Sequence, residues 1–122
     1  MKIEQSLKLV SVKKPDNQNP VVNRRERLIK SINKQLDLIN HYRCGDKVRG
    51  IWWWVDESGT FFLPIKYGKT VLELNKGKFS IECSTIDEIE NNFETVKTLV
   101  RRGSFDEILK TTSETLRLKF IK

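Results

Sequence analysis

A chain of 122 residues, 38% of them hydrophobic and 32% charged, has the size and composition of one soluble domain with its own core. No apolar run approaches the ~20 residues that cross a bilayer, and the N-terminus lacks the apolar core of a signal peptide, so we expect a cytoplasmic protein that does not enter a membrane. The net charge of +7 resides in residues 1–50, which hold twelve Lys or Arg against five Asp or Glu, whereas residues 51–122 hold eleven of each. This asymmetry indicates a polyanionic partner; the alternative is a basic surface that is merely solvated.

The first 19 residues predict a flexible basic arm ahead of a single domain over residues 20–122. Residues 7–14 alternate between apolar and polar types and could add an edge strand. Residues 14–20 are polar and contain two prolines, so they have no reason to fold alone. The candidate nucleic-acid contacts of the arm are Lys13 and Lys14.

Residues 20–42 predict a long helix. Asn19 is a suitable N-cap, Pro20 suits the first helical position, and Gly45 fits a helix stop. Apolar residues recur at the spacing of one helical face, and they are Val21, Leu28, Ile32, Leu36 and Ile39. This face is expected to pack on the rest of the domain.

A different face of the same helix is basic. At about 100° per residue, its cations are Arg27, Lys30 and Lys34, with Arg24 at the margin. Arg25 points toward the apolar side instead, where a long side chain near a helix end can extend to solvent. A row of cations is usually the solvated side of a helix, but this row continues from a basic arm and has few acids nearby. We therefore take these four residues as candidate nucleic-acid contacts.

The sequences Leu7-Lys8-Leu9-Val10 and Asn19-Pro20-Val21-Val22, the latter leading into Arg24-Arg25, open the chain. Over residues 7–30 this pattern resembles a family of small uncharacterised proteins from bacteria and phages. The resemblance implies no activity and no site. It agrees with the absence of alanine and the abundance of Lys, Ile and Asn, which indicate an AT-rich coding source.

Residues 50–64 predict a hairpin that is apolar on both faces. Its turn is Asp56-Glu57-Ser58-Gly59, with the glycine at the position that requires a positive φ. This turn fixes a register in which Val55 faces Phe61 and Trp53 faces Leu63. The side chains expected on the opposite face are Trp52, Trp54, Phe62 and Pro64. One core cannot cover both faces, so the second face requires a helix of the chain, a second subunit or a ligand.

A second hairpin is expected from residues 70–74 and 79–83, with Leu74 opposite Phe79 and Thr70 opposite Cys83. Capping boxes that begin at Thr85 and Ser104 then predict two further helices. The expected fold is α+β: a four-stranded, mainly antiparallel meander sheet over about residues 49–83, with one long helix before it and two after it.

Catalytic and metal-binding patterns are missing from the sequence. His41 is the only histidine, which leaves no His-based dyad and no multi-His metal site. Cys44 and Cys83 have no ligand-like spacing and are expected to be free thiols, with Cys83 in the core. Tyr67-Gly68-Lys69-Thr70 lacks the upstream glycine of a phosphate loop and is expected to be a turn. We expect neither enzymatic activity nor a cofactor.

Two function classes remain. The first is a protein that binds single-stranded DNA or RNA, in which the basic arm and helix contact phosphates and unpaired bases stack on the aromatic residues Trp52, Trp54 and Phe62. The second is a protein-interaction or self-assembling module, such as a phage-type inhibitor of a host protein or a homo-oligomer, with the tryptophan face as its interface. A third, structural interpretation packs Trp52 and Trp54 under the N-terminal helix.

Overall fold

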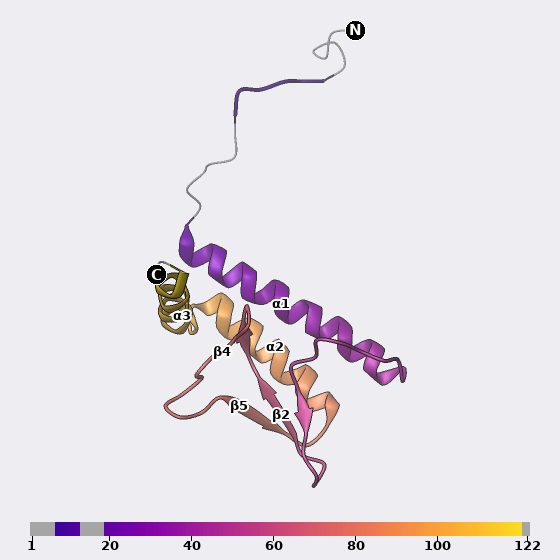
Figure 1. The fold of residues 1–122 in the computed structure, drawn as a ribbon. Coiled ribbons are helices and arrows are strands. Elements are labelled where there is room, and N and C mark those ends of the chain that lie inside the picture. The colour runs from indigo at the N-terminus through magenta and orange to yellow at the C-terminus, as the bar shows by residue number, and fades with distance from the viewer. Residues whose placement is uncertain (1–6, 13–18, 121–122) are drawn as a thin grey trace.

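The computed structural model describes residues 7–12 and 19–120, and it has the expected α+β architecture (Figure 1). In these residues the elements are, in chain order, α1 (Pro20–Arg43), β1 (Trp54–Val55), β2 (Phe61–Pro64), β3 (Lys66–Tyr67), β4 (Thr70–Val71), β5 (Ser80–Cys83), α2 (Ile86–Arg102) and α3 (Asp106–Phe120). One long helix thus precedes the strands and two follow them, as predicted.

Helix α1 begins and ends where its sequence predicts. The Asn19 side chain accepts a hydrogen bond of 2.9 Å from the Val21 backbone N–H, and Pro20 opens the helix. The helix ends at Arg43, two residues before Gly45. Its buried residues include three of the five predicted apolar positions together with one polar residue, and they are Leu28, Ile32, Gln35 and Ile39. The face of α1 that enters the core is therefore the predicted one.

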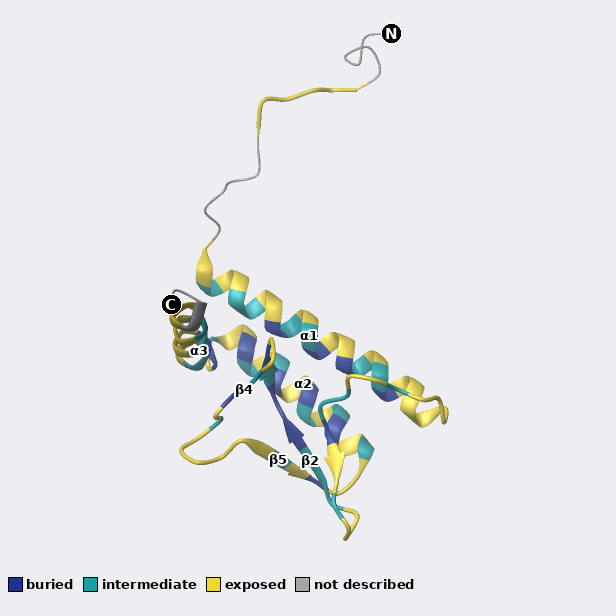
Figure 2. Cartoon of the chain, viewed as in Figure 1, coloured by how far each residue is buried: buried dark blue, intermediate teal, exposed yellow. Residues whose placement is uncertain are grey.

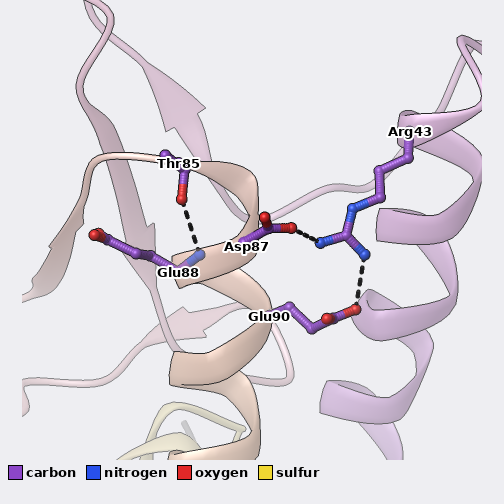
Figure 3. Close-up of polar contacts among 5 residues, drawn as sticks. All are labelled: Arg43, Thr85, Asp87, Glu88 and Glu90. Atoms are coloured by element: carbon purple, nitrogen blue, oxygen red, sulfur yellow. Dashed lines mark hydrogen bonds and ion pairs between the residues drawn. The ribbon is translucent and has the colours of Figure 1, made fainter.

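Helix α2 runs antiparallel to α1, and an arginine joins their adjacent ends (Figure 3). Thr85 caps α2 by accepting a hydrogen bond from Glu88 N at 3.2 Å, which confirms the predicted N-cap, while the Glu88 carboxylate accepts from Ser84 N at 2.6 Å. Arg43, the last residue of α1, donates hydrogen bonds to Asp87 and, at 2.9 Å, to Glu90 of α2. These contacts raise the pKa of Arg43, chiefly through the hydrogen bond to Glu90.

The first hairpin has the predicted register. Trp54 lies opposite Phe62 and Val55 opposite Phe61. One carboxylate oxygen of Asp56 accepts hydrogen bonds from Ser58 N, Ser58 Oγ and Thr60 N at 2.9, 2.7 and 3.0 Å. Gly59 has a φ of 87°, which is the left-handed conformation that the turn was expected to need. The turn thereby fixes which aromatic residues of the two strands meet.

The predicted four-stranded meander is wrong. The described strands form a three-stranded sheet in the order β1-β2-β5 and a separate two-stranded sheet, β3-β4. The turn at residues 75–78 does form, since Leu74 N donates to Lys78 O at 2.8 Å, but β5 pairs with β2 rather than with residues 70–74. Residues 73–79 therefore form a loop outside the sheets. The segments on either side of this loop, residues 70–72 and 80–83, both pair with residues 61–67.

The observed pairing places apolar residues of β5 opposite apolar residues of β2. Cys83 meets Phe61 and Ile81 meets Leu63, so one sheet face presents an apolar row to α2. The predicted hairpin would have placed Cys83 opposite the more polar Thr70. Burial of this apolar row against α2 favours the pairing of β5 with β2.

The core lies between the helices and the inner face of the sheet (Figure 2). Only 3% of the Trp53 surface is exposed, so its predicted burial is confirmed. Its ring meets that of Tyr42 edge to face at 5.9 Å. Its indole N–H has no hydrogen-bond partner in the described part of the chain. Residues 7–12 are exposed and form no strand, so the expected edge strand is absent there.

Candidate nucleic-acid interface

Arg27, Lys30 and Lys34 lie along one exposed side of α1, as predicted. The Arg27 guanidinium carbon is 4.9 Å from the centroid of the Tyr67 ring, a cation–π geometry that positions Arg27 against the turn between β3 and β4. Within the described residues none of the three cations forms an ion pair. Their charge therefore remains available to an anionic partner.

A cavity of ≈ 250 Å³ adjoins this basic face. Its lining comes from three segments distant in the sequence: helix α1, the chain ahead of β1 and the β3–β4 turn. The lining residues are Ser31, Lys34, Gln35, Leu38, Arg49, Gly50, Trp52 and Gly68. We call this the Lys34–Arg49 pocket, because these two cations are its only charged residues. Among its described lining residues there is no carboxylate to repel an anion.

Gln35 joins α1 to the chain that forms the pocket. Its side-chain Nε2 donates to Gly50 O and its Oε1 accepts from Trp52 N, both at 2.9 Å. The residue is only 4% exposed, so both polar ends are satisfied in a buried setting. Gly50 has a φ of 78°, a left-handed conformation that glycine adopts without strain. Together these features hold Arg49 and Trp52 beside Lys34.

Trp52 turns toward the helices, which corrects the expectation that it shares a face with Trp54. Its ring lies 5.9 Å from that of the buried Phe93 in α2, while it also lines the Lys34–Arg49 pocket. The strict alternation of strand side chains does not apply at Trp52, because β1 contains only Trp54–Val55 and Gln35 binds the backbone ahead of it. Trp52 is therefore part core residue and part pocket wall.

Trp54 and Phe62 form a stacked pair on the outer face of the sheet. Their ring centroids are 4.6 Å apart with an interplanar angle of 27°, and Trp54 remains 53% exposed. Glu82 of β5 lies opposite Phe62 in the ladder and is exposed on this same face. The predicted aromatic set is thus divided: Trp52 joins the basic pocket, whereas Trp54 and Phe62 lie beside an acid.

The first turns of α1 face α3. Arg25 donates to both carboxylate oxygens of Asp106, at 2.8 and 2.5 Å. This pair and the charge of Arg24 hold the pKa of Asp106 below its ordinary value, with the Arg25 hydrogen bond as the main cause. The basic row that faces solvent away from α3 therefore begins at Arg27. Lys13 and Lys14 lie outside the described residues.

Arg49 and Gln35 are residues of the candidate site that the sequence did not single out. Arg49 lies between the helix and the hairpin, where no periodic pattern relates it to Lys34. Gln35 follows Lys34 and falls on the apolar side of α1, so a polar residue within the predicted buried face was the one available signal. Such a residue must find hydrogen-bond partners when buried.

A second cavity, of ≈ 470 Å³, lies between the loop at residues 73–79 and α3, and its charge differs from that of the Lys34–Arg49 pocket. It is lined by Glu73, Leu74, Asn75, Lys76, Glu107, Ile108, Thr111 and Thr112. Two carboxylates against one ammonium group make it a poor site for a polyanion. The contrast distinguishes the Lys34–Arg49 pocket from concave surface in general.

Metal-binding clusters and membrane-spanning helices are absent from the described residues, 7–12 and 19–120. No group of three or more His, Cys, Asp or Glu side chains there is arranged to hold a metal ion. None of the helices in this part of the chain is both long and apolar enough to cross a membrane.

Comparisons of the chain with protein-family models, curated proteins and solved structures find no match. The resemblance over residues 7–30 therefore stays a prediction.

Proposed function

We propose that the chain binds single-stranded nucleic acid and catalyses no reaction on it. The observation that carries the proposal is the meeting of Lys34, Arg49 and Trp52 in one pocket, beside the unpaired cations Arg27 and Lys30. Cations without carboxylate partners and an aromatic wall are the two components that single-strand binding requires. They come from separate segments and converge only in the fold.

The cations would supply most of the affinity. Each Lys or Arg that neutralises a phosphate releases a condensed counterion, so binding weakens as salt rises, with a log–log slope of about −0.7 per phosphate contact on a single strand. Arg27, Lys30 and Lys34 follow one another at three- and four-residue spacing on a rigid helix. Such a row contacts a phosphate backbone without reading its sequence.

The aromatic residues favour an unpaired strand. In a duplex the faces of the bases are covered by their neighbours, whereas a single strand can place a base on an aromatic ring for about 1–3 kcal/mol. Trp52 lines the basic pocket and remains partly exposed. Trp54 and Phe62 stack on each other beside Glu82, so a base is expected on Trp52 in preference to this pair.

Fluorescence anisotropy with labelled single-stranded DNA, single-stranded RNA and duplex DNA of equal length tests this function. The triple variant Lys30→Glu, Lys34→Glu, Arg49→Glu should lose binding to every single-stranded sequence about equally. A matched variant with the same change in net charge, Lys76→Glu, Lys78→Glu, Lys110→Glu, reverses exposed cations elsewhere and should bind much better than the first. Absence of binding at low salt, or equal losses in the two variants, would contradict the proposal.

A second candidate, protein interaction, is favoured by the outer face of the sheet. Trp54 there is 53% exposed, whereas Glu82 disfavours a polyanion on this face. Exposed aromatic residues are typical anchors of protein interfaces. Under this function Trp54→Ser would abolish self-association or partner binding and leave nucleic-acid binding intact. Sedimentation equilibrium over a range of concentrations measures the self-association.

A further inference from the structure

We propose that the Lys34–Arg49 pocket is a subsite for a terminal phosphate, a phosphomonoester carried by a nucleotide whose base stacks on Trp52. This inference rests on the proposed function and adds a preference to it: strands that end in a phosphate bind better than strands that end in a hydroxyl.

The size of the pocket favours one nucleotide over a length of strand. Its ≈ 250 Å³ is below the roughly 300–1,000 Å³ of pockets that enclose drug-sized ligands. The pocket is bounded by α1 on one side and by the chain at residues 49–52 on another, with Gly68 of the β3–β4 turn completing the lining. A site bounded by three segments suits the end of a strand, whereas the open row of Arg27 and Lys30 suits its continuation.

The charge of the pocket matches a monoester better than a diester. A phosphodiester inside a strand carries one negative charge, whereas a phosphomonoester carries about −1.5 to −2 near pH 7, because its second pKa is about 6. The pocket supplies two cations, Lys34 and Arg49, and neither forms an ion pair within the described residues. Arginine adds planar donors that match phosphate oxygens.

Trp52 supplies the surface for the base. The centroid of its ring lies 5.9 Å from that of Phe93, which packs against it, and Trp52 is a partly exposed lining residue of the pocket. Gln35 fixes the backbone on both sides of Ile51 with two hydrogen bonds of 2.9 Å. The site is therefore formed before a ligand arrives, which lowers the entropic cost of binding.

The test compares three otherwise identical single-stranded oligonucleotides: one with a 5′-phosphate, one with a 3′-phosphate and one with hydroxyls at both ends. At least one phosphorylated strand should bind the full chain about tenfold more tightly than the hydroxyl strand, as expected for an added charge-assisted contact. This advantage should shrink below about pH 6, where the monoester loses its second charge. Equal binding of all three strands overturns the subsite.

Variants locate the effect. Arg49→Gln and Lys34→Gln alter exposed side chains and should remove the advantage of the phosphorylated strand. Lys30→Gln, the matched control on the same helix outside the pocket lining, should weaken all strands and keep their ratio. An unchanged ratio in Arg49→Gln and Lys34→Gln contradicts the assignment.

The outcomes distinguish the subsite from the proposed function. If the three strands bind equally but with steep salt dependence, the subsite fails and the proposed function stands. If none of the strands binds, the proposed function itself fails.

Competition separates the phosphate from the base. A nucleoside monophosphate should displace the phosphorylated strand at lower concentration than inorganic phosphate, and the unphosphorylated nucleoside should not displace it. Inorganic phosphate that competes as well as the nucleotide would overturn the role of Trp52. Quenching of tryptophan emission by the monophosphate, lost in Trp52→Phe and kept in Trp54→Phe, would support it.

Discussion

The main-chain N–H of Trp52 donates a hydrogen bond of 2.9 Å to the side-chain oxygen of Gln35, seventeen residues earlier in the chain. The side-chain nitrogen of Gln35 donates to Gly50 O. The Gln35 side chain therefore replaces two main-chain partners that a longer β1 would have provided. The segment that carries Arg49 and Trp52 is thereby attached to the helix that carries Lys34. The proposed interface depends on this connection.

We expect Gln35→Leu to destabilise the domain and to weaken nucleic-acid binding together. The substitution leaves Gly50 O and Trp52 N buried without partners, at a cost of about 1–3 kcal/mol for each group that stays unsatisfied. Urea denaturation and anisotropy on the same protein measure the two effects. Unchanged affinity in Gln35→Leu would contradict the positioning role.

The ion pair between Arg25 and Asp106 predicts a dependence of stability on pH. The pKa of Asp106 is lowered in the folded chain, chiefly by the Arg25 hydrogen bond, so the unfolded chain binds its proton more readily. The contribution is fully present above the unfolded pKa of about 3.9 and is lost as pH falls through the lower, folded pKa. Asp106→Asn should therefore lower the melting temperature near neutral pH and have less effect at about pH 3.

Glu107→Gln is the control for this pair, because it removes an exposed carboxylate at the next position in the first turn of α3. It should change the melting temperature less than Asp106→Asn near neutral pH. A deficit in Asp106→Asn that stays the same at both pH values would show that the pair does not act through its charge.

The three tryptophans should respond differently to truncation. Trp53→Ala removes a buried ring and should cost about 3–5 kcal/mol of stability. Trp54→Ala loses mainly the stacking with Phe62, about 0.5–1.5 kcal/mol, because the side chain is half exposed. Trp53→Phe should be milder than Trp53→Ala, since it retains a ring and removes an indole N–H that lacks a partner. Chemical denaturation of the three variants checks the order, and unfolding by Trp54→Ala would contradict it.

The two thiols should differ in reactivity. Cys44 is exposed, whereas Cys83 is buried, and burial raises the pKa of the Cys83 thiol although a hydrogen bond from Asn92 opposes the shift. Because the thiolate is the reactive form, an alkylating reagent should modify one thiol per native chain and two per denatured chain. Mass spectrometry of the peptides identifies the site, and fast labelling of Cys83 in the native protein would contradict its burial.

Local signals predicted local structure well. Asn19 and Pro20 set the start of α1, and Asp56 with Gly59 set the register that brings Trp54 onto Phe62. The partner of β5 could not be predicted in this way, because turn residues at 75–78 favour a hairpin whether or not its strands continue to pair. The choice of β2 depends on which side chains α2 buries, and that is a property of the whole fold.

The candidate site was predicted in its parts and not in its assembly. Periodicity identified Lys30 and Lys34, and the apolar hairpin identified Trp52. That Arg49 joins Lys34 follows from the two hydrogen bonds of Gln35, a residue whose position on the helix predicted burial but not its partners. Rules based on residue spacing cannot predict contacts between segments that lack a repeating pattern.

Both ends of α1 are held by residues that come much later in the chain: Arg25 by Asp106 and Arg43 by Asp87 and Glu90. During synthesis the basic N-terminal segment is made first, and its acidic partners follow. At the usual translation rate of about 5–20 residues per second, roughly 4–16 s separate the synthesis of Arg25 from that of its partner Asp106. The two ion-pair contacts at the ends of α1 can therefore form only after the C-terminal helices have been made.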